Sequence, residues 1–271
     1  MNPKNQLRML NLRVRSAQAW ADALWRLRHD GSDFSIISDN CWGGFLYQHL
    51  RRLYLTPFAG LFMEPDCFLR MLADLRSCLA HPPRRAAASR YGHLEQARGR
   101  LFPEYPIGLL GDGIEVHFLH YATWEEALAK WLRRRDRIRW DRLYFKFTDR
   151  DGADPDLARR FPALPFPRKL YLTNRADVAG NEVVCLGGRG APTVHEGTWE
   201  FRRHMDVPAW LSAERVRGGA WLQKLGAAAD AHLAEQAARR EQVRLAAGGA
   251  PESTPEQVLA HEPERREPTA C

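Results

Sequence analysis

The chain has 271 residues, a net charge of +7 and a pI of about 9.4, and arginine supplies most of the positive charge. Its hydrophobic fraction of 45% suffices for a buried core in one large domain or two small ones, and its charge suits either phosphate-bearing and acidic partners or simply an arginine-rich composition. Its 5 cysteines show no CxxC spacing, which argues against a disulfide framework and a structural zinc site and favours a reducing cytosol.

The N-terminal segment is predicted to form an amphipathic helix from Gln6 to His29, which the polar residues 30–33 end. It lacks the continuous apolar core of a signal peptide, and no run of the chain reaches the roughly 18 apolar residues of a membrane span. We therefore expect a cytoplasmic protein. Its basic helix either packs on the following domain as an arm or associates with a membrane surface.

Short apolar runs alternate with helical stretches from Phe34 onward. The predicted strands are FSIIS, AGLFM, PIGLL, IEVHFLH, RLYFKF, RKLYLT and EVVCL, and the predicted helices span Phe45–Tyr54, Asp66–Leu79, Trp124–Arg135 and Asp156–Phe161. Thr123 is a predicted cap of its helix because Glu126 follows three residues later. This alternation predicts an α/β fold, with a mostly parallel sheet in a three-layer α/β/α arrangement.

The remaining segments set the predicted domain organisation. Residues 81–100 are rich in Pro, Ala and Arg and are expected to be a variable excursion. We expect an N-terminal helical arm over 1–33, an α/β domain over 34–217, a C-terminal helix over 218–247 and a disordered tail over 248–271. The tail has several prolines and too few large apolar residues to form a core.

Polar residues directly follow several of the predicted strands. In a parallel sheet the carboxyl ends of the strands lie at one edge, where ligands bind, so these residues are expected to converge. The competing explanation is that strand-to-helix loops are polar because Asp, Asn and Thr cap helices. The predicted substrate-binding residues are Asp39, Asn40, Trp42, Gly43, Gly44, Glu64, His117, Tyr121, Lys146, Asp151, Asn174 and Arg175.

Cys41 is the candidate nucleophile. It lies between a predicted strand and a predicted helix, and a helix N-terminus lowers the pKa of a thiol. Gly43 and Gly44 would let the backbone approach a substrate or supply oxyanion-hole amides. Three interpretations of Cys41 stay open, namely a nucleophile, a residue that lines the site and a structural thiol.

An acyl-transfer site also needs a base, and the candidates are His117 and His120. His117 shares a strand face with Glu115, which is compatible with a core histidine. His120 lies at the end of its strand, and we favour it as the general base. Asp149 is the candidate acid that orients it.

Asp149 and Asp151 permit a different interpretation, because Asp-x-Asp after a strand can hold a divalent metal against a diphosphate. Acyl-CoA is the cofactor under the first interpretation and a divalent metal under this one, and no metal ligand is assigned. The basic run 133–140 is interpreted as a solvated helix end whose cations face the C-terminal dipole. No signature of a nucleic-acid-binding fold is present, so no nucleic-acid partner is expected.

Four segments carry a resemblance to a known family. They are FSIISDNCWGG, TPFAGLFM, YPIGLLGDGIEVHFLHYATWEEALAKWLRRRDRIRWDRLYFKFTDRDG and LPFPRKLYLTNR. They resemble a bacterial family, domain of unknown function 1919, whose members are labelled exopolysaccharide biosynthesis proteins. The resemblance covers about Phe34 to Arg175 and implies an α/β/α domain and a role among exopolysaccharide or capsule proteins. It implies no catalytic residues.

Three functional hypotheses follow. The first is a transferase or hydrolase that moves an acyl group on a glycan or its precursor, with Cys41, His120 and Asp149 as catalytic residues. The second is a metal-dependent glycosyl or sugar-phosphate transferase that uses Asp149 and Asp151 on a nucleotide-linked or lipid-linked sugar. The third is a non-catalytic assembly or regulatory subunit that binds the polysaccharide machinery or the inner membrane through the N-terminal helix.

Overall fold

The structure is a computed structural model that describes residues 19–100, 104–149, 155–173, 175, 177–178, 180, 183–185, 201 and 205–213. The chain divides into two units, Met1–Ala231 and His232–Cys271, and all described residues belong to the first. The predicted C-terminal helix, the predicted tail, residues 6–18 of the N-terminal helix, Asp151 and Asn174 lie outside the described residues.

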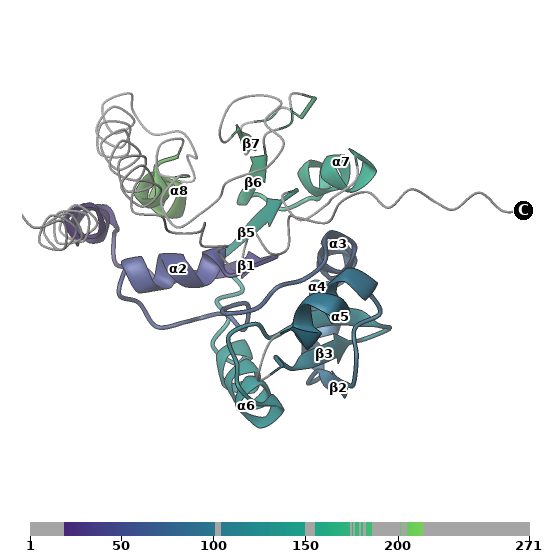
Figure 1. The fold of residues 1–271 in the computed structure, drawn as a ribbon. Helices are drawn as coiled ribbons and strands as arrows, with labels where there is room; N and C mark the ends of the chain where they lie inside the picture. The colour runs from purple at the N-terminus through teal and green to yellow at the C-terminus, as the bar shows by residue number, and fades with distance from the viewer. Residues whose placement is uncertain are drawn as a thin grey trace, which may run out of the picture. The chain divides into compact units, whose positions relative to one another are not determined.

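The central sheet has four strands in the order β1-β5-β6-β7, and every neighbouring pair is parallel (Figure 1). The strands are β1 (Ser35–Ser38), β5 (Leu143–Thr148), β6 (Lys169–Thr173) and β7 (Val183–Cys185). Each matches a strand predicted from its apolar run. Parallel strands are normally covered on both faces, which explains why their polar residues gather at the ends.

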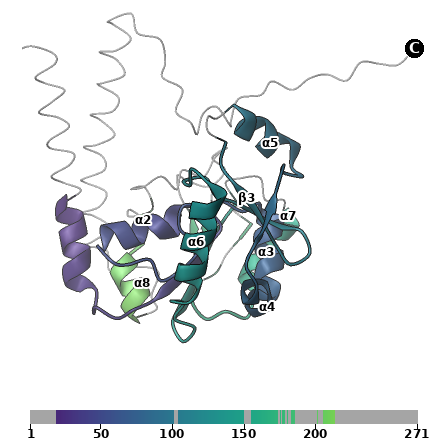
Figure 2. The ribbon, with the colours of Figure 1, turned by 90° about the horizontal axis from the view of Figure 1, so that it is seen from below.

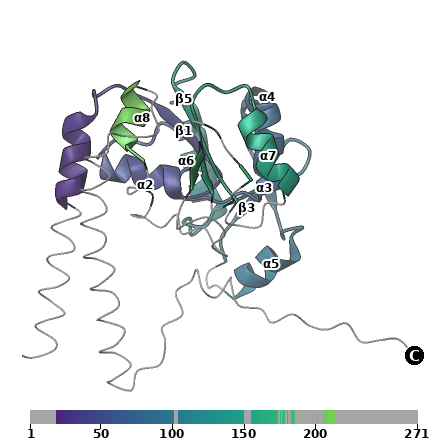
Figure 3. The ribbon, with the colours of Figure 1, turned by 90° about the horizontal axis from the view of Figure 1, so that it is seen from above.

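Helices cover both faces of this sheet, as the three-layer prediction requires (Figure 3). Alternate side chains of β1 and β5 enter different cores, with Ile37 and Phe145 on one face and Ile36 and Tyr144 on the other. The first core is covered by α3 (Pro65–Ala73), α4 (Leu75–Ala80) and α7 (Pro155–Ala163), and the second by α2 (Trp42–His49), α8 (Val207–Ala213) and the helix over 19–28.

A second sheet corrects one part of the prediction. β2 (Arg84–Ala86), β3 (Ile107–Leu110) and β4 (Ile114–His117) form a separate antiparallel sheet in the order β2-β3-β4. PIGLL and IEVHFLH therefore do not extend the parallel sheet. The turn between them is short, and Gly111 and Gly113 adopt positive φ values of 45° and 74°. A tight turn of this kind returns the chain antiparallel, whereas parallel strands need a long crossover.

The prediction of a strand at AGLFM is wrong, because this stretch forms a connection between the two sheets. In this stretch only Phe62 pairs, through an isolated antiparallel bridge to His117. The next residue, Met63, is bound to the parallel sheet instead, because its backbone N donates to the carbonyl oxygen of Asp39, directly after β1, at 2.8 Å. Residues 59–64, which we call the linking segment, therefore lie between the end of β1 and the end of β4 and tie the two sheets together.

The remaining helices match the prediction to different degrees. α6 spans Trp124–Arg135 as predicted, and Glu126 N donates to Thr123 Oγ1 at 3.2 Å. α6 lies beside β3 (Figure 1 and Figure 2). The predicted excursion over 81–100 is instead structured, since it contains β2 and α5 (Gly92–Gly99). No helix in the described part of the chain is long and apolar enough to cross a membrane.

Candidate functional site

The first predicted residues after β1 form a buried ionic network with β5. Asp39 Oδ1 accepts from Lys146 Nζ at 3.0 Å, and Asp39 Oδ2 accepts from Thr148 N at 2.9 Å. Lys146 Nζ also donates to Asn40 Oδ1 at 3.0 Å. All four residues are buried, and a buried ion pair is tolerated when additional hydrogen bonds of this kind satisfy it. The predicted convergence of β1 and β5 at one edge is confirmed, while substrate binding by Asp39, Asn40 and Lys146 stays a prediction.

The two predicted glycines allow α2 to pack tightly. A Cβ on Gly43 would lie 3.1 Å from side-chain atoms of Ile36 and Ser38, and one on Gly44 would lie 3.5 Å from Ala59. Trp42 is also buried, and its backbone N donates to Asn40 Oδ1 at 3.2 Å. The close approach to β1 and to the linking segment therefore explains the glycines, and their use as oxyanion-hole donors stays a prediction.

Cys41 occupies the N-cap position of α2 and is half-buried. Its backbone carbonyl accepts from Phe45 N, and its Sγ donates to Leu61 O at 3.5 Å. The thiol thus faces the linking segment. Deprotonation would remove the hydrogen bond to Leu61 and leave a thiolate near the positive end of α2, which favours negative charge.

His120 and Tyr121 lie against the same segment from the other sheet. His120 N donates to Gly60 O at 3.1 Å, and the Tyr121 hydroxyl donates to Ala59 O. Gly60 has a φ of +77°, and a Cβ there would come within 3.3 Å of both His120 and Tyr121. His120 is exposed, and burial raises the pKa of Tyr121, which accepts from Arg134 Nη1 at 2.6 Å.

The linking segment therefore gathers the proposed nucleophile and the proposed base. The consecutive carbonyls of Ala59, Gly60 and Leu61 accept from Tyr121, His120 and Cys41. We call this arrangement the rim, defined by Cys41, residues 59–61, His120, Tyr121 and Arg134. The parallel sheet contributes Cys41, and the segment after β4 contributes His120. The thiol of Cys41 and the backbone amide of His120 thus bind neighbouring residues of the linking segment, although the strands that precede them belong to different sheets.

His117 behaves as a core histidine, which is one of the two interpretations from the sequence. It is fully buried, and its Nε2 lies 3.1 Å from Glu115 Oε2, as their shared strand face predicts. Glu115 also accepts from Ser89 Oγ at 2.7 Å and Arg90 N at 2.8 Å. Burial lowers the pKa of His117, which favours the neutral imidazole.

Asp149 lies at the end of β5 and is bound to β6. Its Oδ2 accepts from Tyr171 OH at 3.0 Å and from Thr173 Oγ1 at 2.7 Å. Its Oδ1 is buried without a partner among the described residues, and burial raises the pKa of the carboxyl. Its role in orienting His120 stays a prediction. In the described part of the chain, no three His, Cys, Asp or Glu side chains form a group that could hold a metal ion.

Arg175 follows β6 at the same edge of the parallel sheet. Its backbone N donates to Thr173 Oγ1 at 3.0 Å, so the loop after β6 is linked to the partner of Asp149. The guanidinium forms an ion pair with Asp177 at 2.8 Å. The predicted convergence of the polar residues therefore extends from β1 through β5 to β6.

The sequence prediction missed a carboxylate–imidazole pair. Glu64 Oε1 lies 2.7 Å from His93 Nε2, with side chains that are 10% and 65% exposed. A buried carboxylate beside an accessible imidazole can orient it for proton transfer. Glu64 was predicted from its place after the AGLFM run, but His93 belongs to the stretch expected to be a variable excursion. The stretch that forms α5 held a sign of ordered structure, because Leu94 is an apolar residue between polar neighbours, and it is buried in the structure.

Comparisons with known proteins give a family. The profile of a family described as "Domain of unknown function (DUF1919)" matches residues 14–187, which is more than half of the chain. A Haemophilus influenzae protein described as "Uncharacterized protein" is 33% identical over 141 residues. The match covers 52% of this chain and 62% of that relative, so the chain spans less than two thirds of the relative's length.

Proposed function

The chain belongs to the DUF1919 family, and we propose that it acts in the cytoplasm in exopolysaccharide or capsular polysaccharide biosynthesis, moving an acyl group on a glycan or its precursor. The assignment to polysaccharide biosynthesis is supported by the resemblance of the four sequence segments. The acyl-transfer chemistry is supported by one structural observation. Cys41 Sγ and the backbone N of His120 bind neighbouring carbonyls of the linking segment, so a thiol and the residue that carries an exposed imidazole are held to one short stretch of backbone.

The proposed reaction uses the two side chains in turn. His120 takes the proton of the Cys41 thiol, and the thiolate attacks the carbonyl carbon of an acyl thioester such as acyl-CoA. The carbon–sulfur bond of the donor breaks, and its thiolate receives the proton from His120. In the second half, His120 takes the proton of a glycan hydroxyl or of water. That oxygen attacks the Cys41 thioester, and the proton returns to the Cys41 sulfur.

The test measures the covalent intermediate directly. We expect intact-protein mass spectrometry with acetyl-CoA to show one acetyl adduct that Cys41→Ala abolishes and His120→Ala slows by about 100-fold or more. Cys78→Ala is the matched control, because Cys78 is also half-buried but lies on α4, away from the rim. Unchanged acetylation in both the Cys41 and His120 variants would refute the proposal.

The second candidate function is a metal-dependent glycosyl or sugar-phosphate transferase, and the unpaired Oδ1 of Asp149 favours it. A buried carboxylate oxygen without a partner among the described residues is available to a cation. In this case Mn²⁺ or Mg²⁺ raises the melting temperature of the wild type, and Asp149→Asn removes the increase, because binding only the native state stabilises it. If both proteins respond to the metal equally, Asp149 is not a ligand and this candidate fails.

A peripheral association with the inner membrane or with the polysaccharide machinery is proposed for the helix over 19–28. Trp20, Leu24 and Leu27 are 72%, 43% and 82% exposed. They follow one another at spacings of four and three residues, which places them on one helix face. This exposed apolar face supports the third hypothesis, in which the helix recruits the domain to its partner.

A further inference from the structure

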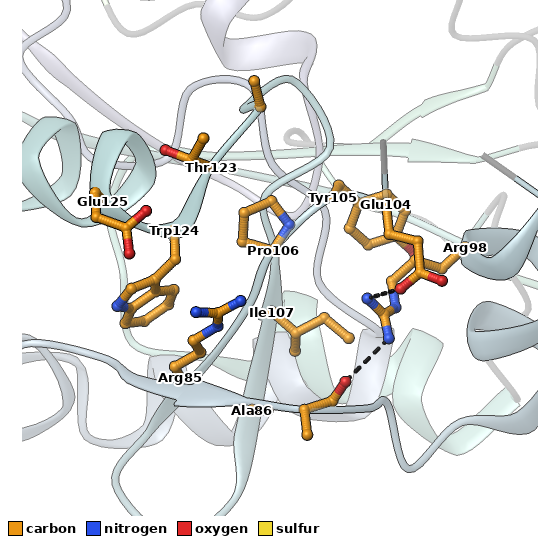
Figure 4. A pocket seen from close by; sticks show the side chains of 12 residues that line it. Arg85, Ala86, Arg98, Glu104, Tyr105, Pro106, Ile107, Thr123, Trp124 and Glu125 are labelled. Atoms are coloured by element: carbon orange, nitrogen blue, oxygen red, sulfur yellow. Dashed lines mark hydrogen bonds and ion pairs between the residues drawn. The ribbon is translucent and has the colours of Figure 1, made fainter. Parts of the chain in front are cut away.

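A hollow of about 720 Å³ lies between the β2–β3 edge and the start of α6 (Figure 4). This volume is within the range of small-molecule sites. The residues that line it include Ala122 and Thr123, which directly follow His120 and Tyr121 of the rim. The hollow and the rim are therefore neighbours along the chain.

One wall combines an indole with two opposite charges. Trp124 contacts Phe118 edge to face at 6.2 Å, and a Cβ on Gly108 would lie 3.5 Å from its ring. The ring is therefore held against β3. In Figure 4, Arg85 and Glu125 lie on either side of it. Both side chains are exposed, and neither side chain has a hydrogen bond or ion pair with another described residue.

The charged side chains of the opposite wall pair with one another. Arg98 pairs with Glu104 at 2.6 Å and with Glu95 at 2.7 Å, and its Nη2 donates to Ala87 O at 3.0 Å. Pro106 lies between this wall and Trp124 (Figure 4). The hollow therefore has an apolar middle and polar groups on both sides, some of which are donors and others acceptors.

These groups select the class of ligand by charge. On the wall beside Trp124, a phosphate would meet Glu125 and a cation would meet Arg85, so an ion of either sign is attracted by one of these side chains and opposed by the other. A sugar ring has no charge, its hydroxyls both donate and accept, and its C–H face can lie on an indole. We propose that the hollow binds a neutral saccharide as the acceptor subsite of the proposed acyl transfer, so the inference rests in part on that function.

The proposal is tested by calorimetric titration of the full chain with neutral trisaccharides of glucose, galactose, mannose or N-acetylglucosamine. At least one should bind at millimolar concentration or better. Trp124→Leu and Arg85→Gln should each weaken that binding by about tenfold or more. The matched controls are Trp20→Leu, which alters an exposed indole outside the hollow, and Arg84→Gln, which alters the adjacent β2 residue that does not line it.

Three results would overturn the inference. They are a lack of binding by every trisaccharide, equal weakening by Arg84→Gln and Arg85→Gln, and binding of uridine diphosphate as tightly as the best trisaccharide. Repeating the titration with Cys41→Ala separates this inference from the proposed function, since binding requires no acyl donor. Retained binding without any acetyl adduct on the wild type would refute acyl transfer alone, and an adduct without saccharide binding would refute the subsite alone.

Discussion

Ionisation of the Asp149 side chain lowers the stability of the folded protein. Its carboxyl is half-buried, one oxygen lacks a partner among the described residues, and burial raises its pKa. A folded-state pKa above the unfolded value of about 3.9 means that the native state holds the proton more tightly. The stability from this difference is fully present below the unfolded pKa and is lost as pH rises through the folded pKa. At neutral pH the ionised Asp149 therefore lowers the free energy of unfolding.

We expect Asp149→Asn to raise the melting temperature at pH 7, because asparagine keeps an acceptor for Tyr171 and Thr173 without the buried charge. The advantage should shrink as the pH is lowered below the unfolded pKa of about 3.9, where the wild-type carboxyl becomes protonated in both states. Thermal unfolding at a series of pH values measures the difference. Asp141→Asn, at an exposed position, is the control. A less stable Asp149→Asn, or a pH-independent difference, would contradict the assignment.

The environment of a single residue was only partly predictable from sequence. The run RLYFKF placed Lys146 in a strand and among the substrate-binding candidates, yet its ammonium group is fully buried against Asp39 and Asn40. The apolar residues on both sides of Lys146 indicated burial. These two partners are 107 and 106 residues away from Lys146 in the sequence, and no local pattern identifies them.

At the scale of elements, the linking segment is the feature on which the rim depends. Gly60 is its most constrained residue, because its φ is +77° and a Cβ would come within 3.3 Å of His120 and Tyr121. An L side chain in the left-handed region costs about 1–2 kcal/mol, and the steric contact adds to that cost. The bridge between the two sheets therefore requires glycine at this position.

We predict that Gly60→Ala destabilises the protein by at least about 1–2 kcal/mol in urea unfolding and reduces acetylation of Cys41 by displacing His120. Gly92→Ala serves as the control, since a Cβ on Gly92 meets nothing within 4 Å and its φ is not positive. Equal stability of the two variants would mean that the segment tolerates a side chain and does not fix the rim.

Element types were largely predictable, and their partners were not. The four strands of the parallel sheet and helix α6 lie where their apolar runs and the Thr123 cap predict. The hairpin of β3 and β4 was assigned to the wrong sheet, because an apolar run indicates a strand without indicating its neighbour. The two turn glycines, Gly111 and Gly113, were the available sign of an antiparallel return.

At the scale of the described domain, the N-terminal helix joins the layer that covers one face of the sheet. Trp25 is buried there against Phe201, and Arg28 Nη2 forms an ion pair with Asp206 at 2.5 Å. The arm therefore packs on the domain, while Trp20 and Leu27 remain exposed on another part of the same helix. Packing and association with a surface are compatible because they use different faces.

We expect the full chain to co-sediment with vesicles of phosphatidylglycerol and phosphatidylethanolamine, and the double variant Trp20→Ser, Leu27→Ser to lose most of that binding. Leu53→Ser is the matched control, since Leu53 is 73% exposed but lies outside this helix. Binding that survives the double change, or that falls equally with Leu53→Ser, would exclude the exposed face as the membrane contact.

The ion pair between Arg28 and Asp206 also bears on how the protein is made, because it joins residues separated by 178 positions. During synthesis the helix over 19–28 emerges early, whereas Asp206 and the α8 helix that directly follows it emerge only after β1, β5, β6 and β7 of the parallel sheet. Until then α2 and the helix over 19–28 present apolar surface without their final cover. Such late closure between distant segments slows folding and leaves the nascent domain open to aggregation, so a ribosome-bound intermediate should depend on chaperones until α8 has left the exit tunnel.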